Sequence, residues 1–180
     1  VVAVNGGGVG PDLAELGAYF WNVIPLANLE VRAAVPYLVN ERGLKKIVLV
    51  YVDDPLGQAI EAELEAELPT VGGELVGSYS IPTSAQQFSG IAAQVRSSGA
   101  DAVYVASFGN QQVQFVKQLR DNGVDAQLVS YSGFSTPDAL SLPESEGIIL
   151  TGQEVNYASG DAVTKRFVAD YKAKYDRDPT

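Results

Sequence analysis

The stretch KKIVLVYVDDPLGQAIEAELEAEL, residues 45–68, joins a strand, a charged turn and a helix. Ile47 to Val52 form an unbroken apolar run, which is typical of a strand buried on both faces of a parallel sheet. Asp53 to Pro55 end this run, and Gly57 opens a helix. Its apolar side chains recur at helical spacing, at Ile60, Leu64 and Leu68. Ligands of open α/β sheets bind outside the carboxyl ends of such strands, so residues 53–58 are the first candidate for a functional site.

The same alternation of strand and helix continues along the chain. Further strands are expected near residues 74–81, 102–107, 127–131 and 148–151, and further helices near residues 28–42, 85–97, 111–121 and 161–175, with a short one after Thr136. The connections between these segments are only a few residues long. The pattern predicts an α/β fold with a doubly wound, mainly parallel sheet, a Rossmann-like lobe.

Two helices carry residues that need their own interpretation. Asn28 is a good N-cap for the helix at residues 28–42, and Pro36 inside that helix should kink it, because proline removes a backbone hydrogen bond. The helix after residue 110 carries four glutamines, which we interpret as a solvated face rather than a recognition surface. They are Gln111, Gln112, Gln114 and Gln118.

The composition excludes several classes of protein. The 180 residues carry a formal net charge of −10, which opposes binding to nucleic acids or anionic membranes, and no basic cluster offsets it. The sequence has no Cys and no His, so thiolate and imidazole metal sites and a Ser-His-Asp triad are excluded. Only carboxylate, hydroxyl or lysine chemistry would be left for an enzyme. We therefore expect a non-catalytic protein without a cofactor or a metal.

No apolar run approaches the ~20 residues of a membrane span, and no basic region followed by an apolar stretch opens the chain. The sequence also lacks Met, which favours a processed chain or a piece of a longer one, and a signal peptide could have preceded it.

Three consecutive glycines, Gly6 to Gly8, follow the apolar residues Val1 to Val4. They predict a loop at a strand's end, because glycine weakens a strand. Neither of the glycine patterns that cradle phosphates is present. A plain turn or a ligand-facing loop is favoured over a phosphate site.

Three turns follow predicted strands at one rim of the sheet, at residues 53–58, 107–111 and 131–135. Their small residues would let a ligand approach the backbone. Gly, Asn, Asp and Ser also occupy ordinary turns for conformational reasons. The residues alone leave both interpretations open.

Asp53 and Asp54 at a strand's end resemble the receiver domain of response regulators, where an acidic pair holds Mg²⁺ beside a phosphorylated aspartate. That family needs an Asp and a Lys at the ends of later strands, where this chain has Ser107, Ser132 and Thr151. We therefore interpret the pair as a turn cap rather than a metal site.

Four segments, residues 45–82, 86–134, 145–152 and 167–179, carry a wider resemblance. They contain F-S opening a helix, a G-A-D-A-V strand, a Q-L-R-D-N-G helix end, an E-G strand and a Y-x-x-K-Y-x-x-x-P exit. In this order and spacing they resemble the type I periplasmic solute-binding proteins of ABC transporters, the branched-chain amino-acid (Leu/Ile/Val) binding family. The resemblance covers nearly the whole chain.

The resemblance implies two Rossmann-like lobes that close on a small molecule around a three-strand hinge. Residues 1–24 would end the first lobe and make the first crossing, residues 25–146 would form the second lobe, and residues 147–180 would cross back and add a helix. The hinge strands would be Tyr19–Ile24 and Ile148–Val155, and the third crossing would lie beyond Thr180. The protein would be a periplasmic or extracellular receptor, with or without a lipid anchor, whose partner is an ABC transporter permease.

The family's contact positions fall on Leu56, on Phe108 with Gly109, and on Ser132 with Gly133. Ser132 stands where the family has the carboxylate that pairs with an amino acid's ammonium, and an unpaired buried charge is costly. The ligand would then be an apolar or aromatic carboxylate, or an uncharged polar compound, more readily than a standard amino acid. The rival interpretation is a ligand-sensing domain of the same fold, in a repressor core or a receptor ectodomain.

Overall fold

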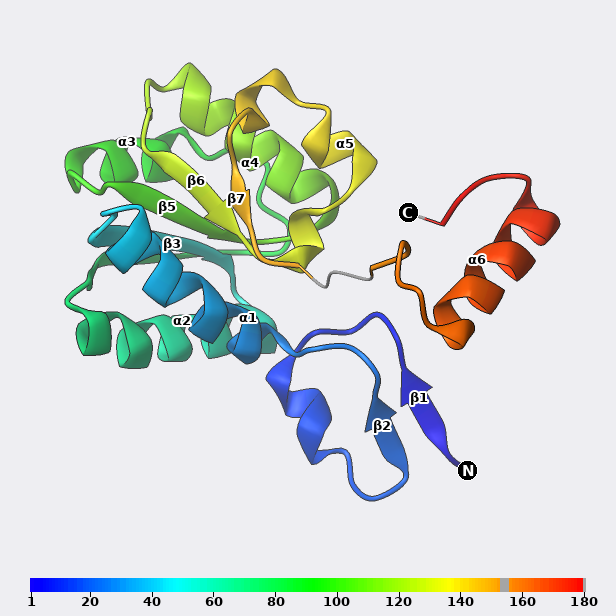
Figure 1. The fold of residues 1–180 in the computed structure, drawn as a ribbon. Coiled ribbons are helices and arrows are strands. Elements are labelled where there is room, and N and C mark those ends of the chain that lie inside the picture. Colours follow the sequence, from blue (N-terminus) through cyan, green and yellow to red (C-terminus); the bar gives the residue numbers. More distant parts are fainter. Residues whose placement is uncertain (153–155, 180) are drawn as a thin grey trace.

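The main body is a five-stranded parallel sheet, seen in a computed structural model that describes residues 1–152 and 156–179 (Figure 1). Its strands are β3 (Lys46–Val52), β4 (Glu74–Ile81), β5 (Ala102–Ala106), β6 (Gln127–Ser130) and β7 (Ile149–Leu150). They lie in the order β4-β3-β5-β6-β7, and every neighbouring pair is parallel. The predicted doubly wound parallel sheet is thereby confirmed.

Helices cover both faces of this sheet (Figure 1). One face packs against α1 (Ala27–Pro36) and α2 (Pro55–Glu67), and the other against α3 (Ser89–Ser97), α4 (Gly109–Asp121) and α5 (Pro137–Leu140). Alternate residues of β3 enter the two cores, because successive side chains of a strand point to opposite faces. Leu49 packs in the first core and Val50 in the second. This is why the run Ile47 to Val52 has no polar residue.

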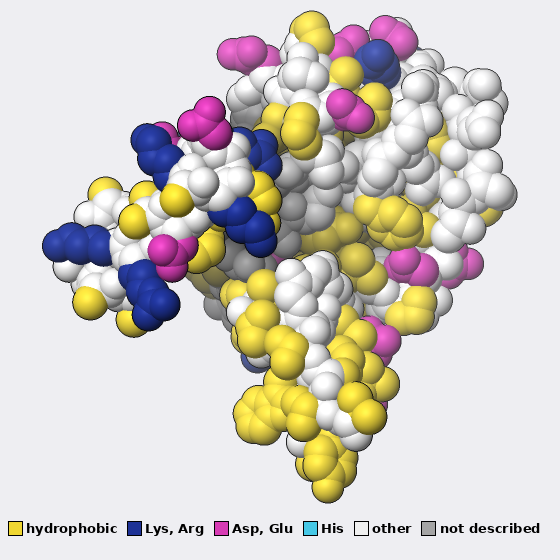
Figure 2. Space-filling model, turned by 90° about the vertical axis from the view of Figure 1, so that its right-hand side faces the viewer, with side chains coloured by type: hydrophobic (Ala, Val, Ile, Leu, Met, Phe, Trp, Pro, Cys, Tyr) yellow, Lys and Arg dark blue, Asp and Glu magenta, His cyan; other side chains and the backbone are white. Residues whose placement is uncertain are grey.

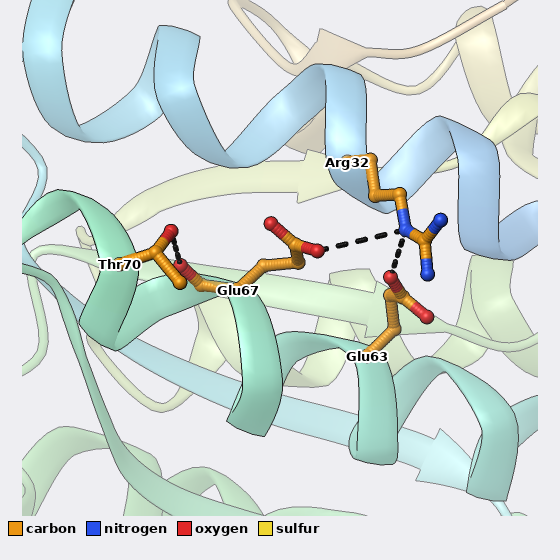
Figure 3. A network of polar contacts seen from close by, with 4 residues as sticks. All are labelled: Arg32, Glu63, Glu67 and Thr70. Atoms are coloured by element: carbon orange, nitrogen blue, oxygen red, sulfur yellow. Dashed lines mark hydrogen bonds and ion pairs between the residues drawn. The ribbon is translucent and has the colours of Figure 1, made fainter.

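Polar contacts tie α1 to α2 (Figure 3). Arg32 on α1 pairs with Glu63 and, at 3.5 Å between Nε and Oε1, with Glu67 on α2. The Thr70 hydroxyl donates to the Glu67 carbonyl at 2.7 Å, where α2 passes into a 3-10 turn, Leu68–Val71. These contacts orient two helices whose apolar faces share the first core.

Two short strands and the last helix lie beside this body rather than in it (Figure 1). β1 (Ala3–Asn5) and β2 (Phe20–Asn22) pair in parallel, with a 3-10 helix, Pro11–Glu15, between them. The helix α6 (Ala162–Tyr175) has no buried residue. Figure 2 shows hydrophobic side chains crowded over β1 and β2, where Val4, Tyr19 and Trp21 are exposed. These segments therefore present apolar surface that the main sheet does not cover.

The ends of the helices correct several local predictions. Leu26, not Asn28, is the N-cap of α1, and Asn28 lies in the first turn with its Oδ1 buried and without a hydrogen-bond partner among the described residues. Pro36 is the last residue of α1, and the helix continues as a π-helical turn over Tyr37–Glu41 rather than as a kinked α-helix. Proline has no N–H to donate, and a wider turn accommodates that gap.

The glutamines of α4 are not the solvated face that the sequence suggested. Gln112 is fully buried and donates to the Gly133 carbonyl at 3.3 Å. Gln118 accepts from the Phe88 N–H at 2.7 Å and donates to the Gln86 carbonyl at 2.9 Å. These two glutamines therefore fix neighbouring segments to α4. Gln118 uses both ends of its side chain, because an amide can donate and accept at once.

Within the described residues, no helix is both long and apolar enough to cross a membrane. The remaining short turns are 3-10 helices at Ser132–Phe134 and Pro143–Ser145. Of the segment Ile148–Val155, which we expect to be a hinge strand, Ile149–Leu150 form β7 at the edge of the main sheet, and residues 153–155 lie outside the described part of the chain.

Candidate functional site

The chain reverses its winding at β3, which has β4 on one side and β5 on the other. The loop after β3 leads into α2 on one face of the sheet, and the loop after β5 leads into α4 on the opposite face. The two loops diverge and leave a crevice at the carboxyl ends of the strands. Ligands of open α/β sheets bind at such a switch point.

A cavity of about 560 Å³ lies at this edge, within the size range of small-molecule sites. None of the lining residues that the structure describes carries a formal charge. They are Gly6, Gly7, Gly8, Val9, Ile24, Leu56, Phe108, Tyr131, Ser132, Gly133, Ser135 and Gly152.

The structure brings four of the five sequence-predicted site residues to this cavity. Leu56, Phe108, Ser132 and Gly133 line it. Gly109 begins α4 beside Phe108, with a φ of +59° that favours glycine, but it is not a lining residue. Three strand-end turns therefore converge as expected, and the glycine loop after β1 faces them across the cavity.

Phe108 and Leu56 lie in the turns that follow β5 and β3. Phe108 is the N-cap of α4 in an extended conformation, and 47% of its surface is exposed. Leu56 lies in the first turn of α2 and packs against the first core. An aromatic ring left half-exposed beside an aliphatic side chain is a surface suited to an apolar group.

Tyr131 and Gly133 shape the floor beside them. The Tyr131 hydroxyl donates to the Ser107 carbonyl at 3.2 Å. A Cβ on Gly133 would lie 2.5 Å from the Tyr131 ring, so only glycine allows this close approach. Burial, and then the nearby carboxylates of Asp54 and Glu30, raise the pKa of the Tyr131 hydroxyl above its usual value. The Tyr131 hydroxyl is therefore neutral, and the carboxylates of Asp54 and Glu30 make its surroundings electrically negative.

Glu30 is the residue that the sequence interpretation missed. It is only 5% exposed, and its Oε2 accepts hydrogen bonds from the Ser132 N–H at 2.7 Å and the Thr151 hydroxyl at 2.8 Å. Its Oε1 accepts the Ser132 hydroxyl at 2.6 Å. The signal was present in the sequence, because Glu30 shares the buried stripe of α1 with Ala27 and Ala34, where apolar residues are expected.

The acidic pair after β3 has a structural use, as the turn-cap interpretation predicted. Asp54 Oδ1 accepts the Gly57 N–H at 2.7 Å and caps α2, which therefore begins at Pro55 rather than at Gly57. Asp53 Oδ1 accepts from the Gln58 amide at 3.1 Å. The described residues contain no group of three or more His, Cys, Asp or Glu side chains that could hold a metal ion.

The glycine loop is also held by its own turn. Asn5 Oδ1 accepts the N–H groups of Gly7 at 3.2 Å and Gly8 at 2.8 Å, and Asn5 Nδ2 donates to the Gly8 carbonyl. Two of the N–H groups that a phosphate cradle would need are therefore already bonded. The loop borders the cavity as a backbone wall.

Comparison with known proteins gives a consistent result. A family model described as periplasmic binding protein matches residues 1–180. The chain is 23% identical over 176 residues to an amino acid binding protein of Pseudomonas aeruginosa, in a match that covers 94% of this chain and 47% of that protein.

Two solved structures share the fold. A branched-chain amino acid ABC transporter periplasmic ligand-binding protein of Burkholderia xenovorans superposes with a TM-score of 0.80 at 23% identity, over 99% of this chain and 49% of that one. A solute-binding protein of an ABC transporter of R. palustris, in complex with benzoate, gives 0.74 at 21% identity, over 89% and 44%. The chain thus spans about half the length of the proteins it matches.

Proposed function

We propose that this chain, which belongs to the periplasmic binding protein family, forms the ligand-binding lobe and hinge pieces of a solute-binding receptor that serves an ABC importer. The observation that carries the proposal is the cavity at the switch point of the sheet, whose described lining residues are all uncharged. Its walls come from three strand-end turns and from segments outside the sheet. Such a site can enclose a small molecule.

The domain division expected from the sequence is part of this proposal. Residues 1–24 end a first lobe, residues 25–146 form the second lobe, and residues 147–180 return to the first. Support comes from the cavity, which Gly6–Val9, Ile24 and Gly152 line opposite the sheet's turns. Further support comes from the exposed apolar surface of β1 and β2, which the rest of a first lobe would cover. Closure would then move the two walls about the crossings.

We infer that the ligand is an amino acid or an aromatic or aliphatic carboxylate. The half-exposed ring of Phe108 and the side chain of Leu56 suit an apolar body. Among the matched proteins, one is named for amino acids and another was solved with benzoate. The receptor would be extracytoplasmic, with a membrane permease as its partner, and would carry out no catalysis.

Calorimetry on the whole protein tests the proposal, after a thermal-shift screen with the standard amino acids, benzoate and branched aliphatic carboxylates. Phe108→Ala should weaken binding of the compound selected by at least about fivefold, because removing an aromatic contact from a ligand site typically costs more than about 1 kcal/mol. Leu140→Ala is the control, since Leu140 is 50% exposed on α5 and does not line the cavity. Unchanged affinity in Phe108→Ala would contradict the site.

A further inference from the structure

Ser132 lines the cavity, yet it has no proton left to give to a ligand. It owns two hydrogen-bond donors, the backbone N–H and the side-chain hydroxyl, and a hydroxyl carries a single hydrogen. Both donate to Glu30, at 2.7 Å to Oε2 and 2.6 Å to Oε1. Ser132 can therefore only accept hydrogen bonds from a ligand, through the lone pairs of its hydroxyl oxygen, because the hydroxyl proton is donated to Glu30.

Glu30 also places a negative charge directly behind this wall. It is buried, and no Lys or Arg forms an ion pair with it in the described part of the chain. Its three hydrogen bonds, from two groups of Ser132 and from Thr151, are all donated to it, which suits the ionised, acceptor-only form. Asp54, which caps α2, adds a second carboxylate near Tyr131 on the same side.

A ligand in the cavity could supply the counter-charge that Glu30 lacks among the described residues. The lining residues within the described part of the chain are all uncharged, and a buried charge gains most from a partner in a place from which water is excluded. A carboxylate of a ligand beside Ser132 would meet no donor from Ser132 itself and would face the charge of Glu30. An ammonium or another donor would meet an acceptor strengthened by that charge.

We propose that Glu30 is a specificity-determining residue that acts through Ser132, making this part of the cavity select ligand groups that donate hydrogen bonds and reject carboxylates. The inference rests on the proposed function, since it assigns a polarity to one wall of the proposed ligand site. It also reverses the preference expected from Ser132 alone, because the carboxylate that the sequence lacks at residue 132 is supplied by α1. A carboxylate in the ligand must then be bound elsewhere in the cavity.

Glu30→Gln tests the inference at almost constant shape. The introduced side-chain amide is neutral and must donate from its nitrogen, so it can no longer accept both protons of Ser132, and the hydroxyl proton becomes free to serve a ligand. The probes are two pairs with matched apolar bodies, L-leucine with 4-methylpentanoate and benzylamine with benzoate. Calorimetry gives the ratio of dissociation constants within each pair. We expect Glu30→Gln to shift that ratio by at least about tenfold toward the carboxylate without an amine.

Two controls separate this role from a structural one. Thr151→Val removes one donor to Glu30 and leaves both Ser132 contacts, so the ratio should stay within about threefold of wild type. Glu61→Gln neutralises a carboxylate that accepts hydrogen bonds from the hydroxyls of Tyr51 and Ser78. Glu61 does not line the cavity, so this variant should also leave the ratio unchanged.

A second variant keeps the inference testable if Glu30→Gln does not fold. Ser132→Ala keeps the N–H donor to Glu30 and removes only the hydroxyl, so amine probes should bind at least about threefold more weakly while benzoate does not. If the wild-type protein binds a probe and neither variant changes the ratio, the role of Glu30 is overturned and the proposed function stands. If no probe and no compound of the wider screen binds the wild-type protein, the proposed function itself is overturned, and the inference with it.

Discussion

Gly57 in the first turn of α2 should resist even the smallest substitution. A Cβ added there would lie 2.2 Å from the Val52 carbonyl oxygen and 2.6 Å from Cδ2 of Tyr51. Ordinary contact begins near 3.4 Å, so α2 would have to move by about 1.2 Å from β3. The obstacle is backbone on one side and a buried ring on the other. Neither can swing away as the end of a flexible side chain does.

The size of the effect follows from two opposing contributions. Overpacking of this kind costs about 1–3 kcal/mol of unfolding free energy, while replacing glycine restricts the unfolded chain and returns about 0.4–1 kcal/mol. Gly57→Ala should therefore destabilise the protein by about 1–2 kcal/mol. At about 2–4 °C per kcal/mol for a chain of this length, the melting temperature should fall by about 2–8 °C. Leu56 next to it lines the cavity, so ligand affinity should fall as well.

Urea unfolding and thermal melts measure the loss, with Gly90→Ala as the matched control. Gly90 also lies in the first turn of a helix, α3, but its added Cβ would meet no atom within 4 Å. The same substitution there should stabilise the protein by about 0.4–1 kcal/mol. Equal stability of the two variants would refute the claim that α2 can pack this closely on β3 only because Gly57 has no side chain.

Substitutions at two further residues probe the same region. Asp54→Ala removes the cap on the Gly57 N–H and should lower the unfolding free energy by about 1 kcal/mol in urea melts, whereas Asp54→Asn, which caps equally well, should lose little. Burial, and then the hydrogen bond to Glu61, raise the pKa of Tyr51 to about 12 from 10.0, so the stability that its neutral hydroxyl contributes is complete below pH 10 and is lost between pH 10 and 12. Tyr51→Phe should consequently be less stable than wild type below pH 10, with a gap that narrows as the pH rises to 12. A constant gap would contradict this account.

The sheet could be predicted from local pattern because its strands are buried on both faces. Every residue of β3 after Lys46 is aliphatic or aromatic, which leaves a signal that can be recognised without knowing the neighbouring strands. The ends of α1 could not be predicted in the same way. Asn28 has the preferred chemistry of a cap, yet Leu26 takes that position, because the packing of α1 on the sheet sets where the helix starts.

The convergence of Leu56 and Phe108 was predictable for a similar reason. Both lie in turns after strands, and parallel strands bring their carboxyl ends to one edge whatever the side chains are. The roles of the glutamines on α4 depend instead on loops distant in sequence. Gln118 forms hydrogen bonds with Phe88 and Gln86, which lie 30 and 32 positions away in the sequence. The helical periodicity of α4 gives no indication of such distant partners.

Glu30 shows how a long-range contact changes the chemistry of a site that local pattern placed well. It meets Ser132 across 102 positions of sequence, and the hydroxyl that stands alone at residue 132 in the sequence is bonded to a buried carboxylate in the structure. A charge on the buried stripe of a helix is expensive unless donors reach it, so such a residue indicates that some distant segment must supply them. Here the donors come from the turn after β6 and the residue after β7, at the edge where the cavity opens. The burial that removes Glu30 from solvent also weakens the screening of its charge, and this is what allows α1 to set the polarity of a wall that it does not itself line.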